Sequence, residues 1–235
     1  MFTKEHCVWI GLCILFITGM CILSIKKKFN LHQAGCIMTF ICLISETTKV
    51  MSGMEESVAG GRHLTPQYLP FHLCSLMIFV VLYLTFAKGE KYKQVLINFV
   101  AVAGSLGSIC AILIPTNGTD FTTTLAYQCF VYHSGLLWFA LYLIISRQAE
   151  LGSVKTLKMN ILILLSLVFI TLYVNGALSV YDTNYLFLTK PPMDNLPYLN
   201  LDHGWYVYFI RIIVLGIVMA VLFQLPFILK KHKIK

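Results

Sequence analysis

Residues 7–24 read CVWIGLCILFITGMCILS, and after Ile25 comes the basic cluster Lys26-Lys27-Lys28. An apolar run of about this length is what a helix needs to cross a bilayer. A secretory signal peptide carries its positive charge before the apolar run and a small-residue cleavage site after it. Here the basic cluster follows the run. We therefore predict a retained transmembrane helix with its N-terminus outside.

The rest of the chain indicates a polytopic membrane protein. The 235 residues are 58% hydrophobic and 12% charged, whereas a soluble domain carries about 25% charged residues. Backbone polar groups in lipid must be satisfied within each segment, so the spans are expected to be helices. We predict a single all-α domain over residues 1–235 with seven transmembrane helices, at about residues 7–24, 31–51, 69–87, 95–114, 124–145, 160–178 and 204–229.

The basic residues predict the orientation of these spans. Most of the 18 Lys and Arg side chains follow the first, third, fifth and seventh predicted spans: Lys26, Lys27, Lys28, Lys88, Lys91, Lys93, Arg147, Lys155, Lys158, Lys230, Lys231, Lys233 and Lys235. By the positive-inside rule this places the N-terminus outside and the C-terminus in the cytoplasm, and we expect the plasma membrane as the location. Anionic lipid head groups account for the net charge of +8, so nucleic acid is not an expected partner.

The eight cysteines form neither a disulfide framework nor a zinc site, because none belongs to a C-x-x-C pair and most lie inside apolar runs. We expect no metal and no cofactor. The default role of each cysteine is that of a small buried apolar residue. Cys74 differs because it lies in Leu69-Pro70-Phe71-His72-Leu73-Cys74, where an outside loop enters the third span. We expect Pro70 to begin that helix, with Cys74 roughly 7–8 Å below the outer boundary.

Polar side chains of four other spans are predicted at the level of Cys74. Glu46, His133, Asn175 and Arg211 all fall in the outer third of the membrane. Polar groups at this depth are costly unless they are partnered or functional. A shared level therefore suggests a pocket that opens to the outer leaflet and takes a small molecule or a lipid.

Each of these residues also has a purely structural interpretation. Cys74 could fill the core, and His133 could form a hydrogen bond between helices. Glu46 could pair with Lys49, three residues away on the same helix face, or with Arg211. His72 lies two residues from Cys74, about 200° around a regular helix, so we expect it to contact a ligand and not Cys74.

The functional interpretation makes Cys74 a nucleophile and His133 its base. A free cysteine thiol has a pKa of roughly 8.5, and a neighbouring imidazole can take its proton and so produce the thiolate. Such a pair attacks an ester carbonyl and forms an acyl-thioester. At a lipid interface the available esters are phospholipid acyl groups, whose phosphate could be held by Arg211, Lys49 or Arg62.

Three stretches of the chain together resemble the YwaF-type bacterial membrane proteins. Their P-x-H-x-C signature is matched by Leu69-Pro70-Phe71-His72-Leu73-Cys74-Ser75, although Phe71 stands where a smaller apolar residue is expected. The other two stretches are Asn184-Tyr185-Leu186-Phe187-Leu188 with Lys190-Pro191-Pro192, and Trp205-Tyr206 with Leu225-Pro226-Phe227. At greater distance the chain is similar to the vertebrate transmembrane protein 164 acyltransferases. The resemblance implies a cysteine-dependent phospholipid acyltransferase with Cys74 and His133 as its catalytic pair, and Asn184 and Tyr185 lining the site.

We therefore predict transacylation between phospholipids and lysophospholipids, which are the expected partners. The expected substrate contacts are His72, Glu46, Lys49, Asn175, Asn184, Tyr185 and Arg211. The alternative is a non-catalytic small-solute transporter or lipid-binding protein that uses the same pocket. A transporter is expected to show an inverted repeat, and the lack of a convincing one favours the enzyme. A structural subunit of a membrane complex is a third possibility, and the sequence gives no indication of the oligomeric state.

Overall fold

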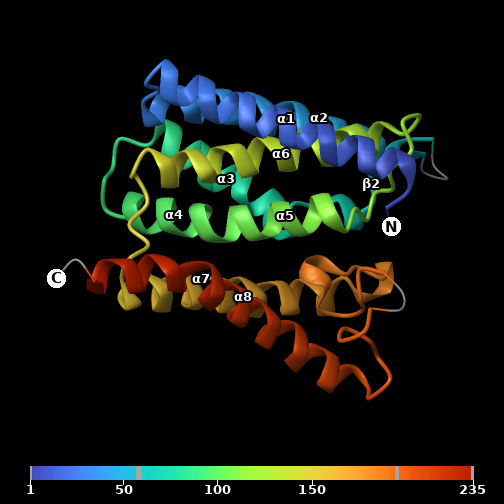
Figure 1. Cartoon of the computed structure of the whole chain (residues 1–235). Coiled ribbons are helices and arrows are strands. Elements are labelled where there is room, and N and C mark those ends of the chain that lie inside the picture. The colour runs from blue at the N-terminus through green and yellow to red at the C-terminus, as the bar shows by residue number, and fades with distance from the viewer. Residues whose placement is uncertain (1, 57–59, 194–195, 234–235) are drawn as a thin grey trace.

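The computed structural model describes residues 2–56, 60–193 and 196–233, with side chains through Lys230, and this part of the chain is almost entirely helical (Figure 1). Its α-helices are α1 (Lys4–Lys26), α2 (Leu31–Ser52), α3 (Leu73–Phe86), α4 (Lys93–Phe99), α5 (Ser105–Leu113), α6 (Thr124–Ile145), α7 (Val154–Ala177) and α8 (Trp205–Lys233). The short elements are 3-10 turns η1 (Pro66–Tyr68), η3 (Ser179–Tyr181) and η4 (Tyr185–Phe187), and the π-helical turn η2 (Val100–Gly104).

Six helical segments in the described residues are long and apolar enough to cross a membrane. They are α1, α2, the continuous segment Lys93–Leu113, α6, α7 and α8 up to Lys230. The chain is therefore an all-helical, multi-pass membrane protein. The apolar helix α3 has 14 residues and is shorter than these six.

Helix α6 forms the centre of the larger group of helices and packs against α1, α2 and α5 (Figure 1). Its middle turns are buried, with Trp138, Phe139 and Ala140 fully inaccessible. Gly135 allows α2 to approach closely, because a Cβ atom there would lie 2.9 Å from Ile41 Cδ1. This central position brings His133, half a turn before Gly135, into the interior.

The fourth predicted span is one segment, α4–η2–α5, interrupted by the π-helical turn at residues 100–104. The π turn ends at Gly104, and Ser105 begins α5. Ser105 is buried, and its hydroxyl donates a hydrogen bond of 2.7 Å to the Ala101 carbonyl. Such π turns allow a helix to bend around a neighbour, and here that neighbour is α6.

Helices α7 and α8 form a pair beside this group, with α7 packed on α4 and α8 on η2 (Figure 1). Asn160 joins the pair internally, because its amide donates a hydrogen bond of 2.8 Å to Gln224 Oε1. The first half of α8 diverges from α7 in Figure 1. Residues 181–187, which follow α7, reach back to the start of α3 through the contacts described below.

The loop between the second and third predicted spans contains the short antiparallel strands β1 (Met54–Glu56) and β2 (Arg62–Leu64), with Glu55 opposite His63. One local expectation from the sequence is wrong. Pro70 was expected to begin the third span, but α3 begins at Leu73. The chain is still extended at His72 (φ −71°, ψ 147°), two residues after Pro70, so His72 and not Leu69 is the N-cap residue.

Candidate active site

Cys74 is the second residue of α3 and not a residue deep within it. His72 is the N-cap residue, and its side chain makes no capping hydrogen bond. The first backbone N–H groups of a helix have no acceptor within that helix. The helix dipole also places partial positive charge at this end, which favours a thiolate or another anion. Cys74 therefore lies among free donors, an environment that a mid-helix cysteine lacks.

His133 of α6 faces the Cys74 thiol. Its Nε2 atom lies 3.0 Å from Cys74 Sγ. Its Nδ1 atom lies 2.7 Å from the carbonyl oxygen of Cys129, one helical turn earlier, and 3.5 Å from Cys129 Sγ. Both the histidine and Cys129 are buried.

These two contacts define how the imidazole is protonated. A carbonyl oxygen can only accept a hydrogen bond, so the contact with Cys129 places the proton of the neutral ring on Nδ1. Nε2 then carries the lone pair and can accept the proton of the Cys74 thiol. The backbone carbonyl of α6 thus fixes the tautomer, which is the role that a carboxylate or amide side chain often takes beside a catalytic histidine.

Residues on both sides of this pair hold it in place. The Tyr132 hydroxyl donates a hydrogen bond to the carbonyl oxygen of Cys74. Lys49 Nζ donates to Ser75 Oγ at 3.0 Å and pairs with Glu46 at 2.8 Å. The Lys49 and Glu46 side chains are only 14% and 26% exposed. Helices α2, α3 and α6 therefore meet around Cys74 through polar contacts.

Helix α5 also approaches the thiol. A Cβ atom on Gly107 would lie 3.7 Å from Leu73 Cδ2 and 4.0 Å from Cys74 Sγ. A larger residue at this position would extend toward the sulfur. Gly107 thus leaves room beside Cys74.

Tyr185 ties the segment between α7 and α8 to the segment that leads into α3. Its ring is buried and lies edge-on to Phe71 and His72, with centroid distances of 5.5 and 5.3 Å. Its hydroxyl donates a hydrogen bond to the Pro66 carbonyl. The buried Asn175 at the end of α7 holds its backbone twice, accepting from Tyr185 N–H at 2.9 Å and donating to Tyr185 C=O at 3.0 Å.

The third resembling stretch contacts the second as well. Trp205 Nε1 donates to the Leu188 carbonyl at 3.0 Å, and the Tyr208 hydroxyl donates to the Phe187 carbonyl at 2.5 Å. Leu186 and Phe187 both have positive φ, at 55° and 54°, a conformation that costs of order 1–3 kcal/mol for a residue with a side chain. The second stretch thus contacts the first stretch just before α3 and the beginning of α8 on its other side.

The predicted site residues fall into two groups and two separate residues, Asn184 and Arg211. Cys74, His133, Glu46 and Lys49 are brought together, and His72, Asn175 and Tyr185 form the adjacent contact just described. Asn184 shapes its own loop, since Oδ1 accepts from the backbone N–H groups of Thr189 and Lys190 at 3.0 and 3.2 Å.

Arg211 contacts the loop before α8 and not Glu46. It donates to the Tyr198 carbonyl at 3.3 Å and to Asn200 Oδ1 at 3.1 Å, and its guanidinium lies 5.5 Å from the Tyr198 ring centre. Of the two pairings considered for Glu46, the structure contains the one with Lys49.

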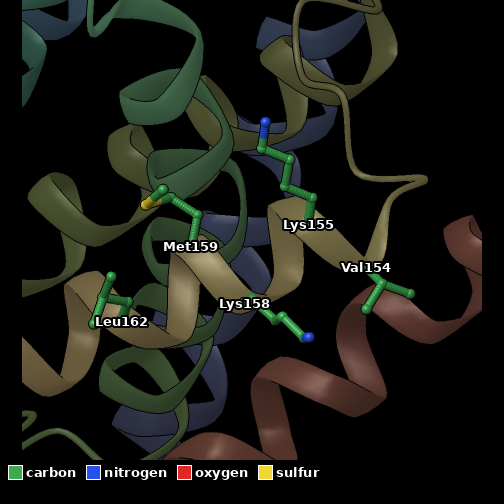
Figure 2. Close-up of a pocket in the computed structure, with 5 residues that line it drawn as sticks. All are labelled: Val154, Lys155, Lys158, Met159 and Leu162. Carbon is green, nitrogen blue, oxygen red and sulfur yellow. The ribbon is translucent and has the colours of Figure 1, made fainter.

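Two cavities are present near other helix ends. One of about 360 Å³ is lined by Val154, Lys155, Lys158, Met159 and Leu162, and Figure 2 shows its two lysine side chains leaving α7 in different directions. The other, of about 270 Å³, lies between α1 and α6 and includes Cys21 and Tyr142. Neither contains Cys74 or His133. No group of three or more His, Cys, Asp or Glu side chains in the described ranges is placed to hold a metal ion.

Three contributors to the site were missed from the sequence. Tyr132 and Ser75 directly flank residues already selected, but neighbours in a helix point in different directions, so adjacency gave no reason to select them. The third is the Cys129 carbonyl, which is a backbone group that every residue has, so the residue type does not indicate this contact. The spacing of Cys129 and His133, four residues on one helix, was the available signal.

Comparison with known proteins gives one match. The model of the TMEM164 family matches residues 1–224. No curated protein and no solved structure matches the chain.

Proposed function

This chain belongs to the TMEM164 family, and from the 3.0 Å contact between Cys74 Sγ and His133 Nε2 we propose that it is a cysteine-dependent membrane transacylase. It moves a fatty acyl group from a phospholipid to a lysophospholipid. The contact carries the proposal because it joins a nucleophile to a base whose tautomer is fixed. The fixed tautomer leaves Nε2 free to take the thiol proton.

The first half-reaction forms an acyl-enzyme. His133 Nε2 takes the Cys74 thiol proton, and the sulfur attacks the carbonyl carbon of a phospholipid ester. A sulfur–carbon bond forms, the bond from that carbon to the glycerol oxygen breaks, and His133 returns its proton to the departing lysophospholipid. In the second half-reaction His133 removes a proton from the hydroxyl of an acceptor lysophospholipid, and the hydroxyl oxygen attacks the thioester carbon. An oxygen–carbon bond forms, the sulfur–carbon bond breaks, and His133 returns the proton to Cys74 Sγ.

The start of α3 supports both steps electrostatically. Each tetrahedral intermediate carries negative charge on the former carbonyl oxygen, and preorganised N–H donors stabilise such an oxyanion. The backbone N–H groups of the first turn of α3, including that of Cys74 itself, are the donors closest in sequence to the sulfur. The Tyr132 hydroxyl holds the Cys74 carbonyl, and this contact fixes the direction of those donors.

The proposed enzyme has seven spans, which are the six longer helical segments and α3. The N-terminus lies outside and the C-terminus in the cytoplasm, because the basic clusters follow alternate spans. The Cys74 end of α3 then faces the outer leaflet of the plasma membrane, whose phospholipids are the substrates. Lys49 is neutralised by Glu46, so its role is to position Ser75 and α3 more than to attract a phosphate.

Acyl transfer in reconstituted vesicles tests the proposal. The full chain is placed in vesicles that contain a phospholipid with one labelled acyl chain and an unlabelled lysophospholipid. The expected result is labelled product and a hydroxylamine-sensitive label on Cys74. Cys74→Ala should reduce both to background, and His133→Gln should slow transfer by about 10²–10⁴-fold, the usual contribution of a general base.

The control is Cys7→Ala, which changes an exposed cysteine of α1 and should transfer acyl groups like the unmodified chain. Transfer that survives in Cys74→Ala would contradict the proposal. Binding of the labelled lipid without any transfer in the unmodified chain would instead indicate a lipid-binding protein.

A further inference from the structure

A second cysteine–histidine pair lies at the opposite end of α3. His32 and Cys36, one turn apart at the start of α2, are in contact through His32 Nε2 and Cys36 Sγ at 3.6 Å. His32 Nδ1 lies 3.0 Å from the carbonyl oxygen of Thr85, the second-last residue of α3. The arrangement repeats that of Cys74 and His133, because a backbone carbonyl again holds the Nδ1 proton and leaves Nε2 facing a thiol.

The pair depends on an unusually close approach of two helices. A Cβ atom on Gly35 would lie 2.3 Å from Thr85 Oγ1, so only glycine lets α2 and α3 meet here. The last carbonyl groups of a helix have no donor within that helix, and the Thr85 carbonyl is one of these. The ring of Phe86 lies edge-on to His32, at a centroid distance of 5.9 Å. The imidazole is thus held by α3 in a fixed orientation.

The surroundings of Cys36 suit an apolar chain. Cys36 is half-buried and His32 is exposed. Phe40, Leu43 and Ile44 lie four, seven and eight residues after Cys36, which places all four side chains on one face of α2. The three apolar side chains are 65%, 53% and 50% exposed. A long hydrocarbon chain attached to Cys36 would lie along this face.

We propose that Cys36 is an S-acylation site, which His32 activates and which takes a long-chain acyl group from a soluble acyl thioester. His32 Nε2 takes the Cys36 thiol proton, and Cys36 Sγ attacks the carbonyl carbon of the donor. A new sulfur–carbon bond forms, the donor's own sulfur–carbon bond breaks, and His32 passes the proton to the departing thiolate. The basic residues Lys26, Lys27 and Lys28 precede this end of α2 and favour an anionic donor such as an acyl-coenzyme A.

The site is separate from the proposed transacylase site. Helix α3 has 14 residues, so at 1.5 Å per residue its two ends are roughly 20 Å apart. His133 cannot serve Cys36 across that distance, nor can the acyl group on Cys74 reach it directly. The inference therefore does not rest on the transacylase proposal.

Labelling of the purified full chain tests the inference. The chain in detergent micelles is incubated with an alkynyl analogue of palmitoyl-coenzyme A, and the thioester on each cysteine is measured by mass spectrometry before and after hydroxylamine. The matched control cysteine is Cys21, which is also half-buried and lies five residues from the same basic cluster. No histidine contact is found for Cys21 within the described residues.

The informative variant is His32→Asn, whose side-chain amide can still donate to the Thr85 carbonyl but has no counterpart of Nε2. We expect hydroxylamine-sensitive label on Cys36, with an initial rate at least about tenfold higher than on Cys21. The rate should fall by about 10²-fold in His32→Asn and stay unchanged in Cys74→Ala. No label on Cys36, equal labelling of Cys21, or an unchanged rate in His32→Asn would each overturn the inference.

Discussion

The attachment of Tyr185 to Asn175 gives the sharpest test of how the site is assembled. Asn175→Leu replaces a buried amide that makes two hydrogen bonds, at 2.9 and 3.0 Å, to the backbone of Tyr185. A buried backbone group left without its partner costs about 1–3 kcal/mol, so two of them cost about 2–6 kcal/mol. Even the lower figure corresponds to an increase of about 30-fold in the undocked population.

Hydrogen exchange of the amides in residues 184–190 measures this population directly. We expect their protection to fall by at least about 30-fold in Asn175→Leu. Alkylation of Cys74 should become faster, because Tyr185 contacts His72 and Phe71 just before α3. The matched control is Asn160→Leu, a buried asparagine on the same helix whose amide bonds Gln224. It should lower overall stability and leave protection in residues 184–190 unchanged. If the amides of residues 184–190 in Asn175→Leu stay protected to within roughly threefold of their protection in the unmodified chain, this account is refuted.

Three further predictions concern single contacts. Tyr132→Phe removes the hydrogen bond to the Cys74 carbonyl and should lower acyl transfer by several-fold while destabilising the protein by only about 0.5–1.5 kcal/mol, as measured by transfer assays and thermal unfolding. Gly135→Ala places a methyl group 2.9 Å from Ile41 and should lower the free energy of unfolding by about 1–3 kcal/mol; a midpoint equal to that of the unmodified chain would contradict the close packing of α2 and α6. Burial raises the pKa of the Tyr185 hydroxyl from 10 to about 12. Its contribution to stability is therefore present below pH 10 and is lost as the pH rises from 10 through 12. Unfolding curves of Tyr185→Phe should show a smaller loss of stability over this pH range than those of the unmodified chain.

Hydropathy and charge predicted the helices well, because each span must satisfy its own backbone and its apolar length is set by the bilayer. The start of α3 was not predicted, because a proline is compatible with the first turn of a helix but does not require one. In the structure His72, two residues after Pro70, is still extended, and α3 begins after it. This local difference moves Cys74 to the first turn of α3, where backbone donors are free.

The candidate site was predictable as a pair of residues but not as an assembly. Cys74 and His133 were selected as polar groups at membrane depth, and the structure brings them into contact. The carbonyl that fixes His133 is a backbone group, and the contacts of Tyr185 join segments more than 100 residues apart. The four-residue spacing of Cys129 and His133 indicates the first contact once a helix is assumed, but the contacts of Tyr185 follow from no periodicity or spacing. The role of Asn184 in its own loop and the contacts of Arg211 with residues 198–200 likewise depend on loop conformation.

The short length of α3 has a consequence for the lipid around it. Fourteen residues span about 21 Å, against a hydrocarbon core of about 30 Å. A segment with this hydrophobic mismatch draws the adjacent monolayer inward and thins it locally. Thinning would lower the ester carbonyls of neighbouring phospholipids toward the first turn of α3, so the substrate would be delivered by deformation of the bilayer and would not have to be extracted from it. Transfer by the proposed enzyme should then be fastest in bilayers of short acyl chains, which are already close to the thickness of α3.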